Sequence, residues 1–226
     1  MKQKLWGGAF AEGPDELAWS FGQSIESDIA LWREEIAVSI AHAEMLGATG
    51  IIPDSDAKAI VEGLRAIRRE AEENGPGLVF PPDAEDIHAA IESLLKKKVG
   101  DAADKLHAGR SRNDQIATVT RLWLRHISDQ LVAKIVRLQR AILDIGEKHK
   151  ADPMPGFTHM QSAQPLTLGF HLMAHYWMLQ RDVIRFKQVA ANANVSPLGS
   201  AALAGTSLPI DRQLTAKELG FASPMS

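Results

Sequence analysis

Apolar residues recur at intervals of three and four along most of the chain, the spacing that places them on one face of an α-helix. Helices are therefore predicted over residues 29–46, 55–73, 83–99, 111–150 and 167–194, with a short one from about residue 211. The alternation typical of strands is nearly absent. The stretch ADPMPGFTHMQSAQP, between the two longest predicted helices, contains three prolines and many polar residues and predicts a loop. The pattern predicts an all-α fold.

The segment from residue 111 to 150 has no proline and keeps its helical period throughout. At ~1.5 Å per residue it forms a rod of ~60 Å, whose apolar face needs partners along its whole length. We therefore expect a small helical N-terminal domain over residues 1–106, followed over residues 107–226 by the first long helices of an elongated bundle.

Composition narrows the classes of partner. The chain has 226 residues, is 45% hydrophobic and carries a net charge of -3, so it can bury a core but offers no broad basic field for nucleic acid or an anionic membrane. It has no cysteine, no apolar stretch of membrane-spanning length and no apolar signal segment in MKQKLWGGAF. We predict a cytoplasmic protein with no nucleic-acid or membrane partner.

The stretch HAGRSRNDQ concentrates polar groups just before the longest predicted helix. Ser111 is a natural N-cap and Asp114 completes the [ST]-x-x-[DE] capping pattern, which by itself explains a capped helix. Capping needs neither Arg110 nor Arg112. Two guanidinium forks at the positive end of a helix dipole favour an anion site, and Asn113 adds a donor and an acceptor beside it.

A second polar concentration, GFTHMQSAQP, contains Thr158, His159 and Gln161. A neutral imidazole with hydroxyl and amide groups nearby is suited to proton transfer near neutral pH. The residues alone leave open whether His159 has a chemical role.

Other candidates have simpler explanations. His88, in EDIHAAIE, fits a solvated helix face with Glu85 and Glu92 as local partners. His171 and His175 lack a third ligand at useful spacing and are predicted to be core or interface residues, and GSAALAG is not a phosphate-binding loop. The sequence predicts no metal site and no nucleotide site.

Taken in order, several motifs resemble those of the argininosuccinate lyases, a branch of the aspartase/fumarase superfamily. The resemblance runs from residue 5 to the end, and GRSRNDQ distinguishes this branch from the other lyases of the superfamily. The motifs are LWGG at 5–8, SIESD at 24–28, SIAHAEML at 39–46, EDIHAAIE at 85–92, KLHAGRSRNDQ, PGFTHMQSAQP and PLGSAALAGTSLPIDR.

The resemblance implies a carbon–nitrogen lyase of arginine biosynthesis that eliminates fumarate from argininosuccinate and leaves arginine. It implies a homotetramer with shared active sites and no metal or organic cofactor. His159 is implied to be a catalytic histidine. The substrate-binding residues it suggests are Ser24, His88, Arg110, Ser111, Arg112, Asn113, Thr158 and Gln161.

Three departures from the family pattern stand out. Ala9 replaces an arginine of the family's LWGGRF, and Glu35 and Val38 replace an aspartate and a glycine, which we expect to change packing more than chemistry. Nothing matches the flexible loop GSSxMPQKxN that supplies the family's base. We therefore expect the chain to lack the C-terminal half, as a fragment or a truncated relative, and to be catalytically incomplete alone.

Two other functions stay open at this point. One is a noncatalytic assembly or storage protein built on a lyase scaffold, which the missing loop favours. The other is a sister lyase that releases fumarate from another substrate such as adenylosuccinate.

Overall fold

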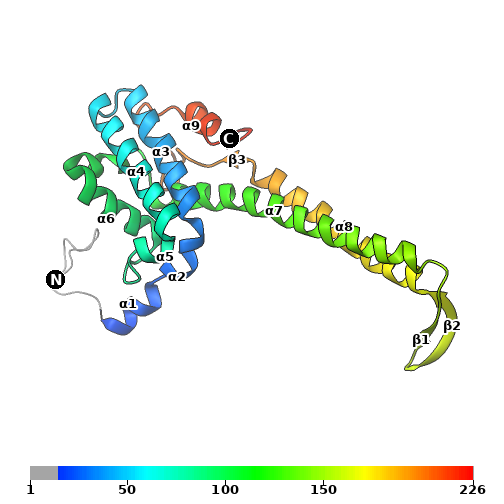
Figure 1. Cartoon of the computed structure of the whole chain (residues 1–226). Coiled ribbons are helices and arrows are strands. Elements are labelled where there is room, and N and C mark those ends of the chain that lie inside the picture. The colour runs from blue at the N-terminus through cyan, green and yellow to red at the C-terminus, as the bar shows by residue number, and fades with distance from the viewer. Residues whose placement is uncertain (1–14, 226) are drawn as a thin grey trace. The chain divides into compact units, whose positions relative to one another are not determined.

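The computed structural model describes residues 15–225 in two compact units (Figure 1). Residues up to Trp123 and those from Val195 onward belong to the first unit, and Leu124–Asn194 form the second. The LWGG motif and Ala9 lie outside the described residues. The division of the chain at residue 106 stays a prediction. The compact units cut across it, because residues 107–123 and the segment after residue 194 pack with the N-terminal helices.

The first unit is helical apart from one short parallel pair of strands. Its elements, in chain order, are α1 (Glu16–Gly22), α2 (Ile25–Asp28), the 3-10 helix η1 (Ile29–Leu31), α3 (Trp32–Ala48), α4 (Asp54–Asn74), α5 (Pro76–Val79), α6 (Ile87–Val99), the 3-10 helix η2 (Gly100–His107), the start of α7 (Arg112–Lys148), β3 (Val195–Ser196), α9 (Arg212–Glu218) and β4 (Ser223–Pro224).

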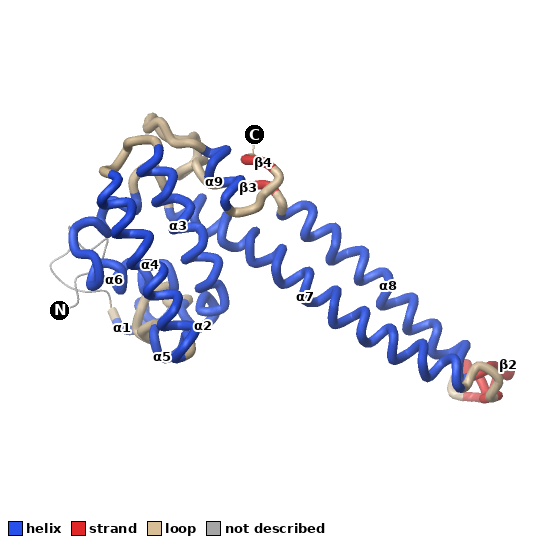
Figure 2. Tube along the Cα trace, turned by 45° about the horizontal axis from the view of Figure 1, so that its top comes forward, coloured by secondary structure: helices blue, strands red, loops and turns tan. Residues whose placement is uncertain are grey.

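The second unit consists of two long helices joined by a hairpin. It contains the rest of α7, the antiparallel strands β1 (Pro153–Thr158) and β2 (Gln161–Thr167), and α8 (Leu168–Ala193). Figure 2 shows α7 and α8 side by side, and Gln139 of α7 donates to the carbonyl of Tyr176 and to Gln180 of α8.

The main core lies between the apolar faces of α3, α4 and α6. Each of these helices turns a row of aliphatic side chains inward, and burying such side chains is the dominant stabilising contribution. The residues with no exposed surface in this cluster are Ile36, Ala43, Leu46, Ile60, Leu64, Ile67, Ile87, Ile91 and Leu95.

A smaller apolar cluster holds the C-terminal segment against α3 and the start of α7. Val38 of α3 and Val119 of α7 are fully buried there, and Leu198, Leu219 and Phe221 complete it from the segment after β3. Val38, which replaces a glycine of the family pattern, thus has the packing role expected of it.

The helical period predicted most of these elements. The predicted helices at 111–150 and 167–194 are confirmed as α7 and α8, and a helix opening near Asp211 is confirmed as α9. The third helix begins later than predicted: Asp86, not Asp83, caps α6 by accepting from the N–H of Ala89 at 2.6 Å.

The loop prediction for residues 151–165 was wrong, because this stretch forms the β1–β2 hairpin. Both strands are almost entirely exposed, so neither needs the alternation of apolar and polar residues that reveals a half-buried strand. Pro155 and Pro165 face each other in the pairing, and Pro155 adjoins an irregularity in it.

Candidate functional site

The predicted site residues fall into two groups, one in each unit. Ser24, His88 and the segment from Arg110 to Asn113 belong to the first unit, and Thr158, His159 and Gln161 belong to the second. In the second unit the three residues lie at one hairpin turn. In the first unit His88, Arg110 and Arg112 are linked through the carboxylate of Glu35, and Ser24 bonds instead to Asp28 and Glu85.

The start of α7 is held by the capping box predicted from HAGRSRNDQ. The N–H of Asn113 donates to the hydroxyl of Ser111 at 3.3 Å, and the N–H of Ser111 donates to the carboxylate of Asp114 at 2.9 Å. Both bonds satisfy N–H groups that a helix start leaves without intrahelical partners. The capping prediction is confirmed.

Asp114 also fixes a second loop beside this helix start. Its other carboxylate oxygen accepts from the N–H groups of Gly199 at 2.9 Å and Ala201 at 2.8 Å. Asn113 is exposed, and its side-chain amide donates to the carbonyl of Ala202 at 3.2 Å. The loop GSAALAG therefore lies against the predicted substrate-binding asparagine, a neighbour that sequence reasoning missed.

Arg112 already holds a carboxylate of this chain. Its Nη1 donates to Glu92 at 3.0 Å and to the side-chain oxygen of Gln115 at 2.9 Å, and its Nη2 reaches the other oxygen of Glu92 at 3.4 Å. This is the two-point geometry that guanidinium groups make with carboxylates. Arg112 thus forms a fork with a carboxylate of its own chain, and the anion site expected from Arg110 and Arg112 stays a prediction.

Arg110 lies inside the first unit. No part of its side chain is exposed, its Nη1 donates to the hydroxyl of Ser39 at 3.2 Å, and its Nε and Nη2 have no hydrogen-bond partner in the described structure. Burial lowers the pKa of this guanidinium, and the nearby carboxylates of Glu35 and Glu92 oppose that effect. The predicted direct contact of Arg110 with substrate does not fit this enclosure.

His88 is buried and pairs with a carboxylate from another helix. Its Nδ1 lies 2.5 Å from the Oε2 atom of Glu35 on α3. The solvated helix face, with Glu85 and Glu92 as local partners, was therefore the wrong explanation for His88.

Glu35 occupies the centre of a buried group of polar side chains. Its Oε1 accepts from the hydroxyl of Ser39 at 2.8 Å and from the amide of Gln115 at 2.6 Å. We call Glu35, Ser39, His88, Arg110 and Gln115 the Glu35 cluster. Glu35 acts as a shared hydrogen-bond acceptor for α3, α6 and α7, and the expectation that it affects packing more than chemistry stays a prediction.

The pKa values of Glu35 and His88 shift in opposite directions within the Glu35 cluster. Burial tends to raise the pKa of the Glu35 carboxyl, but the hydrogen bond and charge of His88, with the charge of Arg110, bring it below its ordinary value. Burial tends to lower the pKa of His88, but the hydrogen bond to Glu35 and its charge raise it above its ordinary value. Both residues are thus favoured in their charged forms.

Ser24 lies at the surface where α2 begins. Its hydroxyl donates to the carboxylate of Asp28 one turn later, and its N–H donates to the carbonyl of Glu85 at 2.9 Å. The second bond ties this serine to the loop before α6. Asp28 was not singled out from the sequence, although it lies in the SIESD motif.

The second group occupies the turn of the β1–β2 hairpin. Thr158 and Gln161 are paired across the strands, and His159 and Met160 form the two-residue turn with φ of 49° and 59°. Two positive φ values in a two-residue hairpin turn fit the type I′ geometry, which usually takes Asn or Gly. Thr158, His159 and Gln161 are all exposed. The turn therefore presents their side chains to solvent.

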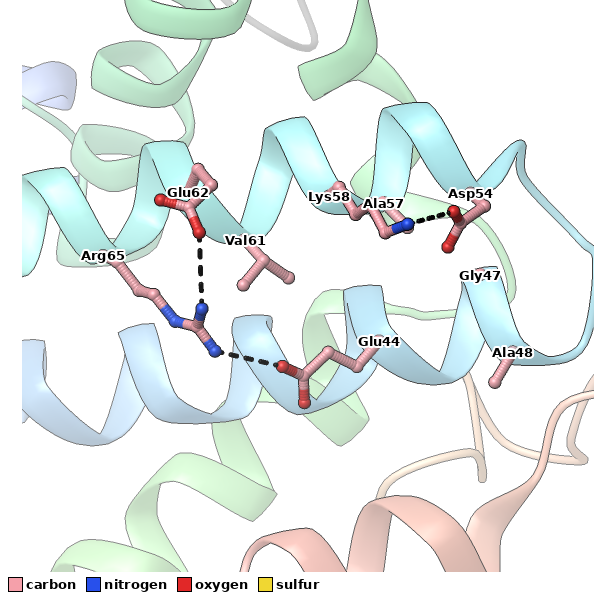
Figure 3. Close-up of a pocket in the computed structure, with 9 residues that line it drawn as sticks. All are labelled: Glu44, Gly47, Ala48, Asp54, Ala57, Lys58, Val61, Glu62 and Arg65. Carbon is pink, nitrogen blue, oxygen red and sulfur yellow. Dashed lines mark hydrogen bonds and ion pairs between the residues drawn. The ribbon is translucent and has the colours of Figure 1, made fainter.

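A pocket elsewhere in the first unit does not include any of these residues. It has a volume of about 360 Å³ and lies between α3 and α4, with Ala57 and Val61 among its lining residues (Figure 3). Glu44 and Glu62 at its edge both pair with Arg65 at 3.4 Å.

The described residues contain no group of three or more His, Cys, Asp or Glu side chains that could hold a metal ion. Within the same part of the chain, no helix combines the length and apolar character needed to cross a membrane.

Comparison with known proteins relates this site to a group of enzymes. A family model described as lyase matches residues 8–226. The argininosuccinate lyase of Pelotomaculum thermopropionicum is 46% identical over 220 residues, which cover 97% of this chain and 47% of the relative. That of Streptococcus uberis is 48% identical over 219 residues, with the same two shares. The chain thus spans about half the length of the curated relatives it matches.

A solved structure supports the same relationship. A variant of EDDS lyase with bound fumarate matches with a TM-score of 0.73 and 31% sequence identity, over 87% of this chain and 38% of that one. Since the family model covers nearly all of the sequence, the chain belongs to the lyase family.

Proposed function

We propose that this chain forms part of an argininosuccinate lyase, which converts argininosuccinate to arginine and fumarate. The observation that carries the proposal is the segment from Arg110 to Asp114, where a capping box and a buried polar cluster fix the start of α7 and leave the amide of Asn113 exposed. The argininosuccinate lyases at 46% and 48% identity support the choice of substrate.

The reaction sets definite chemical demands. A base removes a proton from the carbon next to a carboxylate, that carboxylate takes up negative charge, and the carbon–nitrogen bond then breaks. The departing guanidine receives a proton or leaves as guanidinium, and fumarate remains. Preorganised hydrogen-bond donors must hold the developing charge, and no metal or organic cofactor forms part of the proposal.

The first unit supplies binding groups in this proposal. Asn113 and Ser111 lie at the helix start, where backbone N–H groups and the helix dipole favour a carboxylate. Arg112 is 29% exposed and can share its guanidinium between Glu92 and a substrate carboxylate. Ser24 adds a hydroxyl. Arg110 and His88, both buried, support the segment from within.

The second unit supplies the proton-transfer group. His159 is proposed to act in catalysis, with Thr158 and Gln161 as hydrogen-bonding groups to the substrate. All three lie at an exposed turn, where their side chains are available to another molecule. We propose that this molecule is a substrate bound in a site shared between copies of the chain, which form a homotetramer.

The surface of the second unit supports assembly. Leu138 on α7 and Trp177 and Ile184 on α8 are among its exposed large apolar residues. Exposed apolar side chains along long helices are typical of faces that pack against other subunits. Light scattering that shows only monomer at micromolar concentration would contradict the tetramer.

The activity is tested by following fumarate release. The 226-residue chain is mixed with a separately produced segment that carries the remaining length of a curated argininosuccinate lyase, and each part is also assayed alone. We expect the mixture to release fumarate from argininosuccinate but not from adenylosuccinate. Release from adenylosuccinate alone would indicate a sister lyase, and release from neither would indicate a noncatalytic scaffold.

The role of Asn113 is tested in the same mixture. Asn113→Leu is expected to abolish turnover with little change in thermal stability, because Ser111 and Asp114 still cap α7. Asn74→Leu is a matched control, since Asn74 is also exposed and its amide also donates to a backbone carbonyl, that of Glu70 at 3.0 Å. Normal turnover with a large fall in melting temperature for Asn113→Leu would assign Asn113 a structural role.

A further inference from the structure

Both arginines of the GRSRND segment connect to one carboxylate through a single intermediate side chain. Arg110 donates to Ser39 at 3.2 Å, and Ser39 donates to Glu35 at 2.8 Å. On the other side, Arg112 donates to Gln115 at 2.9 Å, and Gln115 donates to Glu35 at 2.6 Å. Glu35 is thus the common end of two hydrogen-bond relays.

From this geometry we propose that Glu35 is a positioning residue. Its carboxylate fixes which groups donate and which accept in both relays. It thereby holds the segment from Arg110 to Asn113 in the orientation that binds substrate. The catalytic consequence rests on the proposed lyase function, whereas the positioning itself does not.

The physical basis is that an ionised carboxylate accepts hydrogen bonds and cannot donate them. The Gln115 amide must therefore turn its NH₂ group toward Glu35, which leaves its oxygen facing the guanidinium of Arg112. If Glu35 lost its charge, the amide would be free to flip, and its NH₂ group would then meet the N–H groups of Arg112. Arg112 also pairs with Glu92, so its orientation depends on two carboxylates: Glu92, which it contacts directly, and Glu35, which it reaches only through Gln115.

The same logic applies to Ser39. Its hydroxyl has one proton, which goes to Glu35, so its oxygen remains free to accept from Arg110. Arg110 has no exposed side-chain surface, and its Nε and Nη2 have no hydrogen-bond partner in the described structure, although Nη2 lies 4.0 Å from a carboxylate oxygen of Glu92. The hydrogen bond to Ser39 is therefore an important restraint on its guanidinium.

The remaining oxygen of Glu35 is committed to His88 at 2.5 Å. This contact keeps a positive charge beside Glu35 and favours the ionised form on which both relays depend. The two relays connect Glu35 to Arg110 and Arg112, the residues before and after Ser111, which caps α7. One acidic side chain thereby restrains the chain on both sides of the helix start.

The test reads the two arginines separately. In nitrogen-15 spectra of the 226-residue chain, a guanidinium held by hydrogen bonds rotates slowly and gives resolved Nη–H signals. We expect Ser39→Ala to broaden the signals of Arg110 and leave those of Arg112, and Gln115→Ala to do the reverse. Glu35→Gln should broaden both, whereas Glu35→Asp, which keeps the charge, should retain them.

The decisive result is that Ser39→Ala and Gln115→Ala each affect the signals of only one arginine. The effect of Glu35→Gln alone does not separate lost positioning from lost folding. Ser39→Ala and Gln115→Ala leave the Glu35–His88 pair in place, and unchanged helical circular dichroism checks the fold. If each of these two variants broadened both arginines equally, or neither, the relays would not exist and the proposal would be overturned.

The catalytic consequence is measured in the mixture described above. Gln115→Ala is expected to raise KM for argininosuccinate by about tenfold with a smaller change in kcat, since it loosens a carboxylate-binding group. An unchanged KM would contradict the functional part of the proposal. A wild-type mixture that releases no fumarate would instead contradict the lyase function, and the spectra would still decide the positioning role.

Discussion

The segment around Arg110 and the turn around His159 contain similar side chains in opposite surroundings. In the first, Arg110 is buried, as is Glu35, to which it is linked through Ser39, and their polar atoms bond mostly to other side chains of the chain. In the second, Thr158 and His159 are exposed, and the turn is closed by backbone pairing. Buried polar residues of the first region are part of the fold, whereas the polar side chains of the second are open to solvent.

The contrast separates polar residues that stabilise the fold from polar residues that are exposed to solvent. A buried charge must be paired, so its position is fixed by its partners and its loss is costly. An exposed side chain at a turn contributes little to stability. Substitutions in the two regions should therefore differ sharply in their effects on folding.

The largest difference in stability between variants of the two regions should come from replacing Glu35. Glu35→Leu is expected to lower the free energy of unfolding by ~3–5 kcal/mol, because the buried charges of His88 and Arg110 lose their counter-charge. Thr158→Val at the exposed turn should change it by less than ~0.5 kcal/mol. Urea denaturation of both variants measures the difference, and equal losses would show that the contrast between the regions is false.

A pH titration sharpens the comparison through His42, which neighbours the Glu35 cluster. Its Nε2 lies 2.9 Å from the carbonyl of Ala108, and burial, followed by the charge of Arg110, lowers its pKa from 6.5 to about 3. A lowered histidine pKa means that the unfolded chain takes up the proton first, so the stability from neutral His42 is lost as pH falls from 6.5 toward 3.

The window between pH 6.5 and 4.5 isolates this contribution. The raised pKa of His88 affects stability only above 6.5, and the lowered pKa of Glu35 only below 4.5. As pH falls across these two units, we expect the free energy of unfolding to decrease by about 2–3 kcal/mol, at roughly 1.4 kcal/mol per unit. His42→Gln keeps a donor for Ala108 and should flatten most of the slope, although His107, whose pKa is also lowered, adds a smaller part. An unchanged slope would rule out His42 as its source.

The sequence could reveal the helices and the cap but not the Glu35 cluster. Helical period and capping depend on residues within a few positions of one another, as with Ser111 and Asp114. Glu35 is 53 positions from His88 and 80 from Gln115, so no local pattern relates them. Tertiary packing of α3, α6 and α7 brings them together.

The hairpin escaped prediction for a different reason. Its turn residues, His159 and Met160, are not the Asn or Gly typical of a type I′ turn, and its strands are exposed on both faces. Backbone pairing alone defines the element, and side-chain patterns carry no sign of it. The resemblance of GFTHMQSAQP to a family motif was recognisable from sequence even though its conformation was not.

A moderate loss of stability is expected when Asp114, which joins α7 to the loop at Gly199, is replaced. Asp114→Asn keeps one acceptor oxygen and loses the other, so either the cap on Ser111 or the bonds from Gly199 and Ala201 must be given up. We expect a loss of ~1–3 kcal/mol in unfolding free energy.

Asp211→Asn provides the comparison for Asp114. Asp211 is exposed and caps α9 by accepting from the N–H of Leu214 at 2.9 Å, and asparagine caps helices about as well as aspartate. Its replacement should change stability by less than ~0.5 kcal/mol. If the two variants melted alike, Asp114 would be an ordinary cap rather than a link between two segments.

A small effect of opposite sign, a gain in stability, should come from a substitution in the turn itself. Met160 is fully exposed and has φ of 59°, a left-handed conformation that costs a side-chain-bearing residue ~1–2 kcal/mol. Met160→Gly removes that strain but gives the unfolded chain more freedom, so we expect a net gain of only ~0.5–1 kcal/mol. Ala163→Gly, at the third residue of β2 and without positive φ, should instead lose a similar amount. Thermal melts of the two variants should therefore shift in opposite directions. A loss of stability in both would mean that the strained turn is not set by backbone geometry alone, and that the Met160 side chain has a contact of its own in the assembled protein.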